Sequence, residues 1–253
     1  MAGTDSTRTP KLGGPSVILV EPQLGENVGA AARAMLNCGL TDLRLVNPRC
    51  GWPNEKATAM ASGALDRDVE VTLFDTVADA IADLNYLLAT TARHRFMAKP
   101  LYTARQAAAE LRARTADGQR CGVLFGGERA GLTNDDVALA NAIVTVPLNP
   151  AFSSLNLGQS VLLIGYEWYL SDDATPARAL ETKGSPPASK KELLNFFHRL
   201  ETALEETGFL RLPDMRPAMV RNLRNLFQRA ELTEQELKTL HGVIASLRKG
   251  SGG

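Results

Sequence analysis

The stretch SVILVEPQLGENVGAAARAMLNCGL, residues 16–40, joins an apolar strand to an alanine-rich helix. Residues 16–21 centre on a continuous aliphatic run, which is typical of a parallel strand that is covered on both faces. Residues 27–38 carry small apolar side chains at helical spacing, so this helix is predicted to pack against the sheet. Arg33 lies in the middle of the helix. The simplest interpretation is that its aliphatic stem covers apolar surface while its guanidinium reaches water.

Strands and helices alternate along the rest of the first 170 residues. Further apolar runs predict strands at 42–47, 69–74, 85–90, 121–126 and 142–147. Helices are predicted between and after them at 54–62, 76–83, 103–114, 134–140 and 155–170. This alternation predicts one α/β domain with a mainly parallel sheet over residues 15–170, preceded by a flexible polar tail over residues 1–14.

The composition excludes several classes of protein. Lys and Arg together number 28, as do Asp and Glu, so any nucleic-acid surface must come from local clustering of charge. Cys38, Cys50 and Cys121 lack metal-binding spacing and are interpreted as free thiols, and no metal is expected. The N-terminus lacks an apolar signal core and no run approaches membrane-spanning length, so the protein is expected in the cytoplasm.

The chain changes character after residue 170. Residues 171–189 are rich in Pro, Ser and Thr without periodicity and are interpreted as a linker. Residues 190–249 have the periodicity of three helices, the first with Ser189 as a predicted N-cap and Glu192 at the capping-box position. This extension is locally basic, with Arg211, Arg216, Arg221, Arg224 and Arg229 against Asp214 alone. These arginines form either a solvated face or an RNA-binding surface, and the second hypothesis assigns phosphate contacts to Arg221 and Arg224.

The signatures of common α/β enzymes are missing from the sequence. No GxGxxG follows a strand, no Walker motif occurs and no GxSxG nucleophile elbow is present. Polar clusters instead follow the predicted strands, at 21–33, 90–95, 125–136 and 147–160. Open α/β sheets bind ligands at the carboxyl ends of their strands, so these clusters are the candidate site. Each cluster alone also has a structural interpretation, because glycines make turns and Ser or Asn caps helices.

Three of these clusters resemble a known family. ENVGAAARAM, LFGGERAGLTNDD and NPAFSSLNLGQSVLLIGYE are similar to the three motifs of the SPOUT-class RNA 2'-O-methyltransferases of the TrmH group, over residues 15–170. TTARHR and the helical extension are most similar to the bacterial branch that methylates cytidine or uridine at position 32 of the tRNA anticodon loop. The resemblance implies S-adenosylmethionine as methyl donor, tRNA as substrate, a C-terminal segment threaded in a trefoil knot, and a homodimer packed through the knot. The alternatives are another tRNA or rRNA site and a non-catalytic RNA-binding module.

The resemblance also implies roles for particular residues. It assigns the reaction at the ribose to Asn27, Arg33, Glu128, Ser154 and Asn156. It assigns the cofactor to loop residues, namely Thr90, Thr91, Ala92, Gly126, Val146, Leu148, Ser153, Ser154 and Leu155. Arg33 is also expected to contact RNA. The chain departs from the family at one position, since relatives often carry Arg where this chain has Gly127. This difference puts one phosphate contact in doubt and leaves the assignment to the methyltransferase class unchanged.

The chemistry of methyl transfer agrees with these residue types. Transfer from a sulfonium to a ribose hydroxyl needs in-line positioning and loss of the hydroxyl proton, and it needs no metal. Glycine-rich and irregular loops offer backbone groups that hold an adenine. Because a guanidinium is a poor base, Arg33 is expected to stabilise the developing alkoxide, and action as the base is the alternative. The helix at 155–170 is apolar nearly all round, which suits either a dimer interface or an ordinary core helix.

Overall fold

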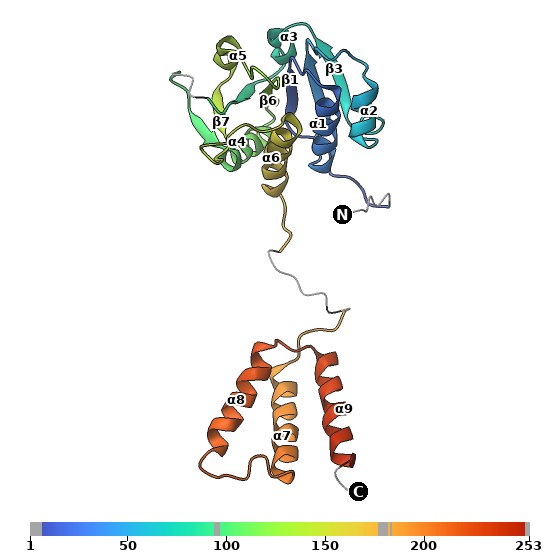
Figure 1. Ribbon diagram of the computed structural model, residues 1–253, viewed down its shortest axis with the longest axis vertical. Coiled ribbons are helices and arrows are strands. Elements are labelled where there is room, and N and C mark those ends of the chain that lie inside the picture. Colours follow the sequence, from blue (N-terminus) through green and yellow to red (C-terminus); the bar gives the residue numbers. More distant parts are fainter. Residues whose placement is uncertain (1–6, 94–96, 177–181, 183, 251–253) are drawn as a thin grey trace. The chain divides into compact units, whose positions relative to one another are not determined.

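The computed structural model describes residues 7–93, 97–176, 182 and 184–250. The chain divides into two compact units, Met1–Thr175 and Pro176–Gly253, which are treated separately below (Figure 1). No helix in the described ranges is long and apolar enough to cross a membrane.

The first unit is built on a seven-stranded sheet with the order β3-β2-β1-β6-β4-β7-β5, in which all neighbouring strands are parallel. Its strands are β1 (Ser16–Val20), β2 (Asp42–Val46), β3 (Glu70–Phe74), β4 (Tyr86–Thr90), β5 (Leu101–Thr103), β6 (Cys121–Gly126) and β7 (Ala142–Thr145). The predicted strands and the α/β class are confirmed. The sequence does not predict β5, because this strand is only three residues long, lies at the sheet edge and leaves Leu101 and Thr103 exposed, so no apolar run marks it.

Helices connect these strands and cover both faces of the sheet. They are α1 (Gly25–Asn37), α2 (Glu55–Ala61), α3 (Val77–Ile81), α4 (Ala104–Ala116), α5 (Asn134–Leu139) and α6 (Leu157–Leu170). The last of them begins later than residue 155, because the Asn156 side chain accepts the N–H groups of Gly158 and Gln159 and caps the helix.

Two apolar cores flank the sheet. Val17 and Leu19 of β1 face one core, which α1, α2, α4 and α6 complete. Ile18 and Val20 face the other core, which α3 and α5 complete. Every residue of β1 is buried, which confirms the prediction of a strand that is covered on both faces. The small residues of α1 allow close packing, since a Cβ at Gly158 of α6 would lie 2.8 Å from the Ala30 Cβ.

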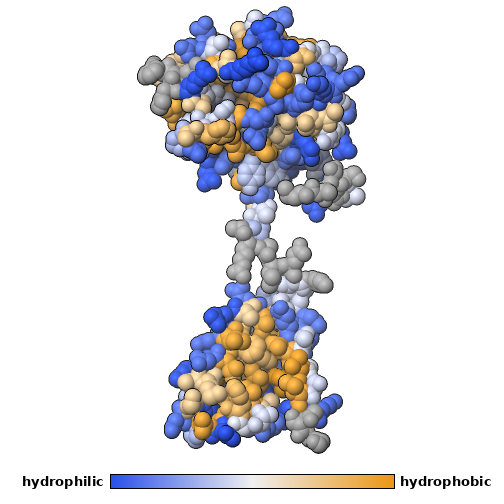
Figure 2. All heavy atoms as spheres, in the orientation of Figure 1, coloured by the Kyte–Doolittle hydropathy of each residue, from blue (hydrophilic) through white to orange (hydrophobic). Residues whose placement is uncertain are grey.

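The second unit contains α7 (Lys190–Glu206), α8 (Arg216–Arg229) and α9 (Glu234–Gly250). The predicted capping box is present, with the Ser189 hydroxyl accepting from the Glu192 N–H and the Glu192 carboxylate accepting from the Ser189 N–H. Phe196 and Phe197 of α7 form its core with apolar side chains of α9 and with Phe227 of α8. Large apolar side chains also remain on its surface, and Figure 2 shows a broad apolar area on the face in view.

Parts of the predicted tail and linker belong to the units. The tail joins the first unit at Gly13, whose N–H donates to the Gly39 carbonyl at 2.8 Å. The end of the linker pairs with the start of α9, because the Ala188 N–H donates to the Leu232 carbonyl (2.9 Å) and the Glu234 N–H to the Pro186 carbonyl (3.1 Å). The first six residues, 177–181 and 183 lie outside the described residues.

Candidate active site

A cavity of about 320 Å³ lies at the carboxyl ends of β4, β6 and β7, where parallel sheets place their ligands. Its lining includes every residue that the sequence resemblance assigned to the cofactor. Thr90, Thr91 and Ala92 come from the end of β4, and Gly126 comes from the end of β6. The loop between β7 and α6 supplies the others, which are Val146, Leu148, Ser153, Ser154 and Leu155.

The walls of this cavity suit a ligand with one apolar ring and several polar groups. Phe125, Val144 and Leu157 add apolar surface, and Ser160 adds a hydroxyl beside those of the loops. The volume lies at the lower end of the range that is usual for small-molecule sites, about 300–1,000 Å³. The lining therefore fits S-adenosylmethionine, with apolar walls for its adenine and hydroxyl and backbone groups for its polar ends.

The glycines of the second motif form one wall of the cavity. The chain turns back between Gly127 and Gly131, and the Gly131 N–H donates to the Gly127 carbonyl at 2.9 Å. A Cβ at Gly126 would lie 2.2 Å from the Leu132 nitrogen, so only glycine lets the strand end and this loop approach so closely.

A chain of hydrogen bonds joins the three motifs. The Asn27 amide nitrogen donates to Glu128 Oε1 at 2.7 Å, and the Asn27 oxygen accepts from the Asn156 amide nitrogen at 2.8 Å. Asn156 in turn caps α6 through the Gly158 N–H, at 2.9 Å. Asn27 is 7% exposed, whereas Asn156 is exposed, so both bonds are partly shielded from water. We call this set, Glu128, Asn27 and Asn156, the amide relay.

Glu128 is the acceptor at one end of the amide relay. Its carboxylate also accepts from the N–H groups of Gln23 (2.8 Å) and Leu24 (3.2 Å), which precede α1. Burial alone raises the pKa of Glu128, but the bonds from Asn27 and from backbone N–H groups outweigh it, so the pKa lies below its ordinary value. Glu128 is therefore held as a carboxylate with its oxygens already occupied by donors.

Arg33 lies apart from this cavity. It is exposed on α1, and its Nη1 donates to the Ser62 hydroxyl at 3.0 Å, at the end of α2. Gly29, one turn earlier, faces the same helix, because a Cβ there would lie 2.1 Å from the Ala57 carbonyl oxygen. In the described part of the chain, Glu128 and Ser154 line the cavity, whereas Arg33 does not.

Two exposed arginines at the cavity are not among the predicted site residues. Arg93 follows β4 and Arg129 stands in the loop after β6, and both line the cavity. Each belongs to one of the polar clusters that follow the strands, so the useful signal is a cation inside a glycine-rich or strand-end motif. His94 and Arg95 of TTARHR lie outside the described residues.

The arginines of the helical unit fall into two groups. Arg224 donates from Nε and Nη2 to the two carboxylate oxygens of Glu201, at 2.7 and 3.0 Å, and Arg216 pairs with Glu205. Arg221 is exposed, and no described carboxylate pairs with it. Of the two arginines in this unit that are predicted to contact RNA, Arg224 is thus ion-paired to α7 and Arg221 is exposed to solvent.

Comparison with known proteins decides the family. Residues 14–166, which contain the cavity and the amide relay, match the SpoU rRNA Methylase family. The chain belongs to the SpoU methylase family. A second match, over residues 191–251, is to the C-terminal domain of the tRNA methyltransferase TrmJ.

Similar SpoU methylases span nearly the whole chain. The Pectobacterium atrosepticum protein named tRNA (cytidine/uridine-2'-O-)-methyltransferase TrmJ is 37% identical, over 92% of this chain and 96% of its own. The crystal structure of TrmJ from Z. mobilis ZM4 has a TM-score of 0.79 and 46% identity, over 92% of this chain and 98% of its own. A probable methylase family protein from Haemophilus influenzae Rd KW20 has a TM-score of 0.57 and 30% identity, over 92% and 95%.

Proposed function

We propose that this protein transfers a methyl group from S-adenosylmethionine to the 2'-hydroxyl of a cytidine or uridine in tRNA, at position 32 of the anticodon loop. The observation that carries the proposal is that all nine assigned cofactor residues gather around one cavity, in a chain of the SpoU methylase family. The similarity to TrmJ along both units supports tRNA as the substrate. A tRNA substrate in turn supports a cytoplasmic location.

The chain's own residues prepare the site. S-adenosylmethionine, when bound, supplies a methyl group on a sulfonium centre. Thr90 to Ala92 and Ser153 to Leu155 hold it from two loops, and Gly126 leaves room for the loop that follows β6. The amide relay joins the loop after β6 and the start of α6 to α1, so we assign Glu128, Asn27 and Asn156 as positioning residues, while Ser154 lines the cavity where the methyl group is transferred. Such pre-orientation accounts for a large part of the rate in transfer reactions.

Arg33 acts, in this proposal, across a homodimer. It lies outside the cavity of its own chain, which leaves it free to serve the cavity of a second copy. α6 presents Leu162, Leu163, Tyr166 and Leu170 to solvent, an apolar stripe that a second subunit would cover. Arg33 of the partner subunit then stabilises the negative charge that develops on the ribose oxygen. The trefoil knot implied by the sequence resemblance stays a prediction.

The test is methylation with purified components. Wild-type protein, radiolabelled S-adenosylmethionine and unmodified tRNA transcripts should give one 2'-O-methyl group, at nucleotide 32, and transcripts with a deoxyribose there should give none. Methylation at another tRNA nucleotide, or methylation of rRNA in a parallel reaction, would contradict the assignment to position 32. Cofactor and tRNA binding without transfer would instead support a non-catalytic RNA-binding module.

A further inference from the structure

The face of α8 that points away from α7 has an unusual composition. Val220 is buried and Leu223, Arg224 and Phe227 are half-buried, which fixes the side that packs on α7. At 100° per residue, the opposite side carries Asn222, Asn225 and Arg229 at its centre, with Arg221, Gln228 and Leu226 at its edges. All six are exposed. We call them the outer face of α8.

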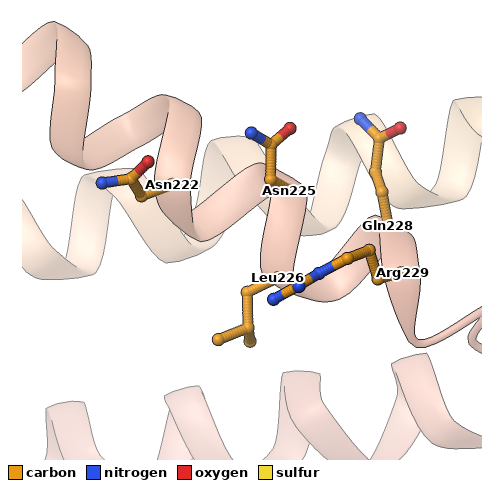
Figure 3. Close-up of a pocket in the computed structure, with 5 residues that line it drawn as sticks. All are labelled: Asn222, Asn225, Leu226, Gln228 and Arg229. Carbon is orange, nitrogen blue, oxygen red and sulfur yellow. The ribbon is translucent and has the colours of Figure 1, made fainter.

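The outer face forms a shallow, open surface to which α8 alone contributes the lining residues. Figure 3 shows the residues that line it, with Asn222, Asn225 and Gln228 following one another along the helix and Leu226 and Arg229 beside them. The carboxamides of Asn225 and Gln228 project in the same direction (Figure 3). No described group hydrogen-bonds any of these three carboxamides, so each retains a free donor and a free acceptor.

The charge of α8 is divided between its two sides. Its inward and lateral arginines are neutralised by α7, since Arg224 pairs with Glu201 and Arg216 with Glu205. Arg221 and Arg229 on the outer face have no carboxylate partner among the residues described. Residues 215–230 contain no Asp or Glu. The outer face therefore presents positive charge together with neutral hydrogen-bonding groups, which complements a polyanion that also offers base edges.

We infer that the outer face of α8 reads unpaired bases of the tRNA. Asn222, Asn225 and Gln228 hydrogen-bond to base edges, while Arg221 and Arg229 contact the adjoining phosphates. Carboxamides match base edges because both carry a donor beside an acceptor, and loops of RNA expose the edges that duplexes hide. This inference rests on the proposed function and adds to it the means by which the helical unit distinguishes one RNA sequence from another.

The test compares amide and arginine variants of the full chain. The amide variant is Asn222→Ala with Asn225→Ala and Gln228→Ala, and its matched control replaces the exposed amides Asn195 and Gln235 of α7 and α9 by Ala. Alanine favours helix at each position, so the variants should fold, which circular dichroism checks. Affinity is measured for cognate tRNA and for tRNA with substituted anticodon-loop bases, at several salt concentrations.

The amide variant should bind cognate tRNA at least about 10-fold more weakly, because it lacks the side-chain hydrogen bonds to the base edges. It should bind cognate and loop-substituted tRNA almost equally, with the salt dependence of the wild type. The double variant Arg221→Ala with Arg229→Ala should weaken the binding of both RNAs alike. The slope of log affinity against log salt concentration should fall by about 0.7–0.9 for each phosphate that is no longer neutralised.

Retained discrimination between the two RNAs in the amide variant, or behaviour equal to the control, would overturn the inference. A change in affinity with undiminished discrimination would also overturn it, because the amides would then not be reading bases. The proposed function fails if the wild-type protein transfers no methyl group to tRNA. The binding comparison is independent of that result, because it needs no turnover.

Discussion

The two units treat carboxamide side chains in opposite ways. In the first unit Asn27 is 7% exposed and bonded at both ends, to Glu128 and to Asn156. On α8 of the second unit, Asn222 and Asn225 are exposed, and no described group bonds their side chains. The same functional group is closed to ligands in one unit and open to them in the other.

This difference shows that a carboxamide takes its role from its partners. A buried amide with both ends occupied transmits position from one segment to the next, because leaving either end unpaired is costly. An exposed amide keeps its donor and acceptor for whatever binds. We therefore expect substitutions in the first unit to act on geometry and rate, and those in the second to act on RNA affinity.

The largest expected effect tests whether substitutions in the first unit act on the rate of methyl transfer. Arg33→Ala should lower methyl transfer by about 100-fold or more while S-adenosylmethionine affinity stays unchanged, because the missing charge acts on the developing alkoxide. Arg33→Lys should recover only part of the rate, since an ammonium lacks the planar fork. Single-turnover kinetics measures the rate of methyl transfer, and calorimetry measures the affinity for S-adenosylmethionine. Arg120→Ala is the control, because Arg120 pairs with Asp83 at the amino ends of the strands, away from the cavity.

The next effect tests the amide relay. Asn27→Ala removes one of the three donors to Glu128 and leaves the Asn156 amide nitrogen without its acceptor, so the free energy of unfolding should fall by about 1–3 kcal/mol. Asn37→Ala, at an exposed position of the same helix, should change it by less than about 0.5 kcal/mol. Fluorescence in denaturant reports on the first unit alone, because both tryptophans, Trp52 and Trp168, lie there. Equal unfolding curves for the two variants would contradict a positioning role.

A smaller effect separates two arginines of α8. Arg221→Ala should weaken tRNA binding and lower its salt slope by about 0.7–0.9, the value for one phosphate contact. Arg224→Ala should leave the slope unchanged and lower stability by up to about 1 kcal/mol, because its partner is Glu201. Affinities measured across a salt series decide the matter, and a reduced slope for Arg224→Ala would show that RNA displaces Glu201.

The smallest effect concerns acid stability. The pKa of folded Glu128 lies below the ordinary value of 4.5, so its carboxylate stabilises the fold above that pH, and the stabilisation is lost as the pH falls through the folded pKa. Glu128→Gln should therefore show a weaker loss of stability than the wild type between about pH 5 and pH 3. Tryptophan fluorescence across this range measures it, with Glu70→Gln on the exposed position of β3 as the control. Parallel curves of stability against pH for the wild type and Glu128→Gln would show that the Glu128 carboxylate does not contribute to acid stability.

Local patterns were enough for most of the fold and for the place of the candidate site at the strand ends, whereas the individual cofactor residues were assigned by the family resemblance. Aliphatic runs mark the buried strands, and the loops at their carboxyl ends must meet because the strands are parallel. Contacts that depend on tertiary packing were not predictable. The bond between Asn27 and Asn156 spans 129 residues, and the pairing of Arg224 with Glu201 follows from the way α8 lies on α7. Arg129 was not predicted because an exposed loop cation has no periodic signal, and only its place inside a glycine-rich motif marks it.

Gly127 has a consequence for how this sequence can change. A Cβ there would lie 2.6 Å from the Glu21 carbonyl oxygen, and Glu21 itself adopts a left-handed φ of 48°. An arginine at this place, which the family resemblance suggested for relatives, therefore requires the turn after β1 to move before its side chain fits. We therefore expect the effect of a side chain at position 127 to depend on the residue at position 21. Homologues with a side chain at 127 should also differ at or beside position 21.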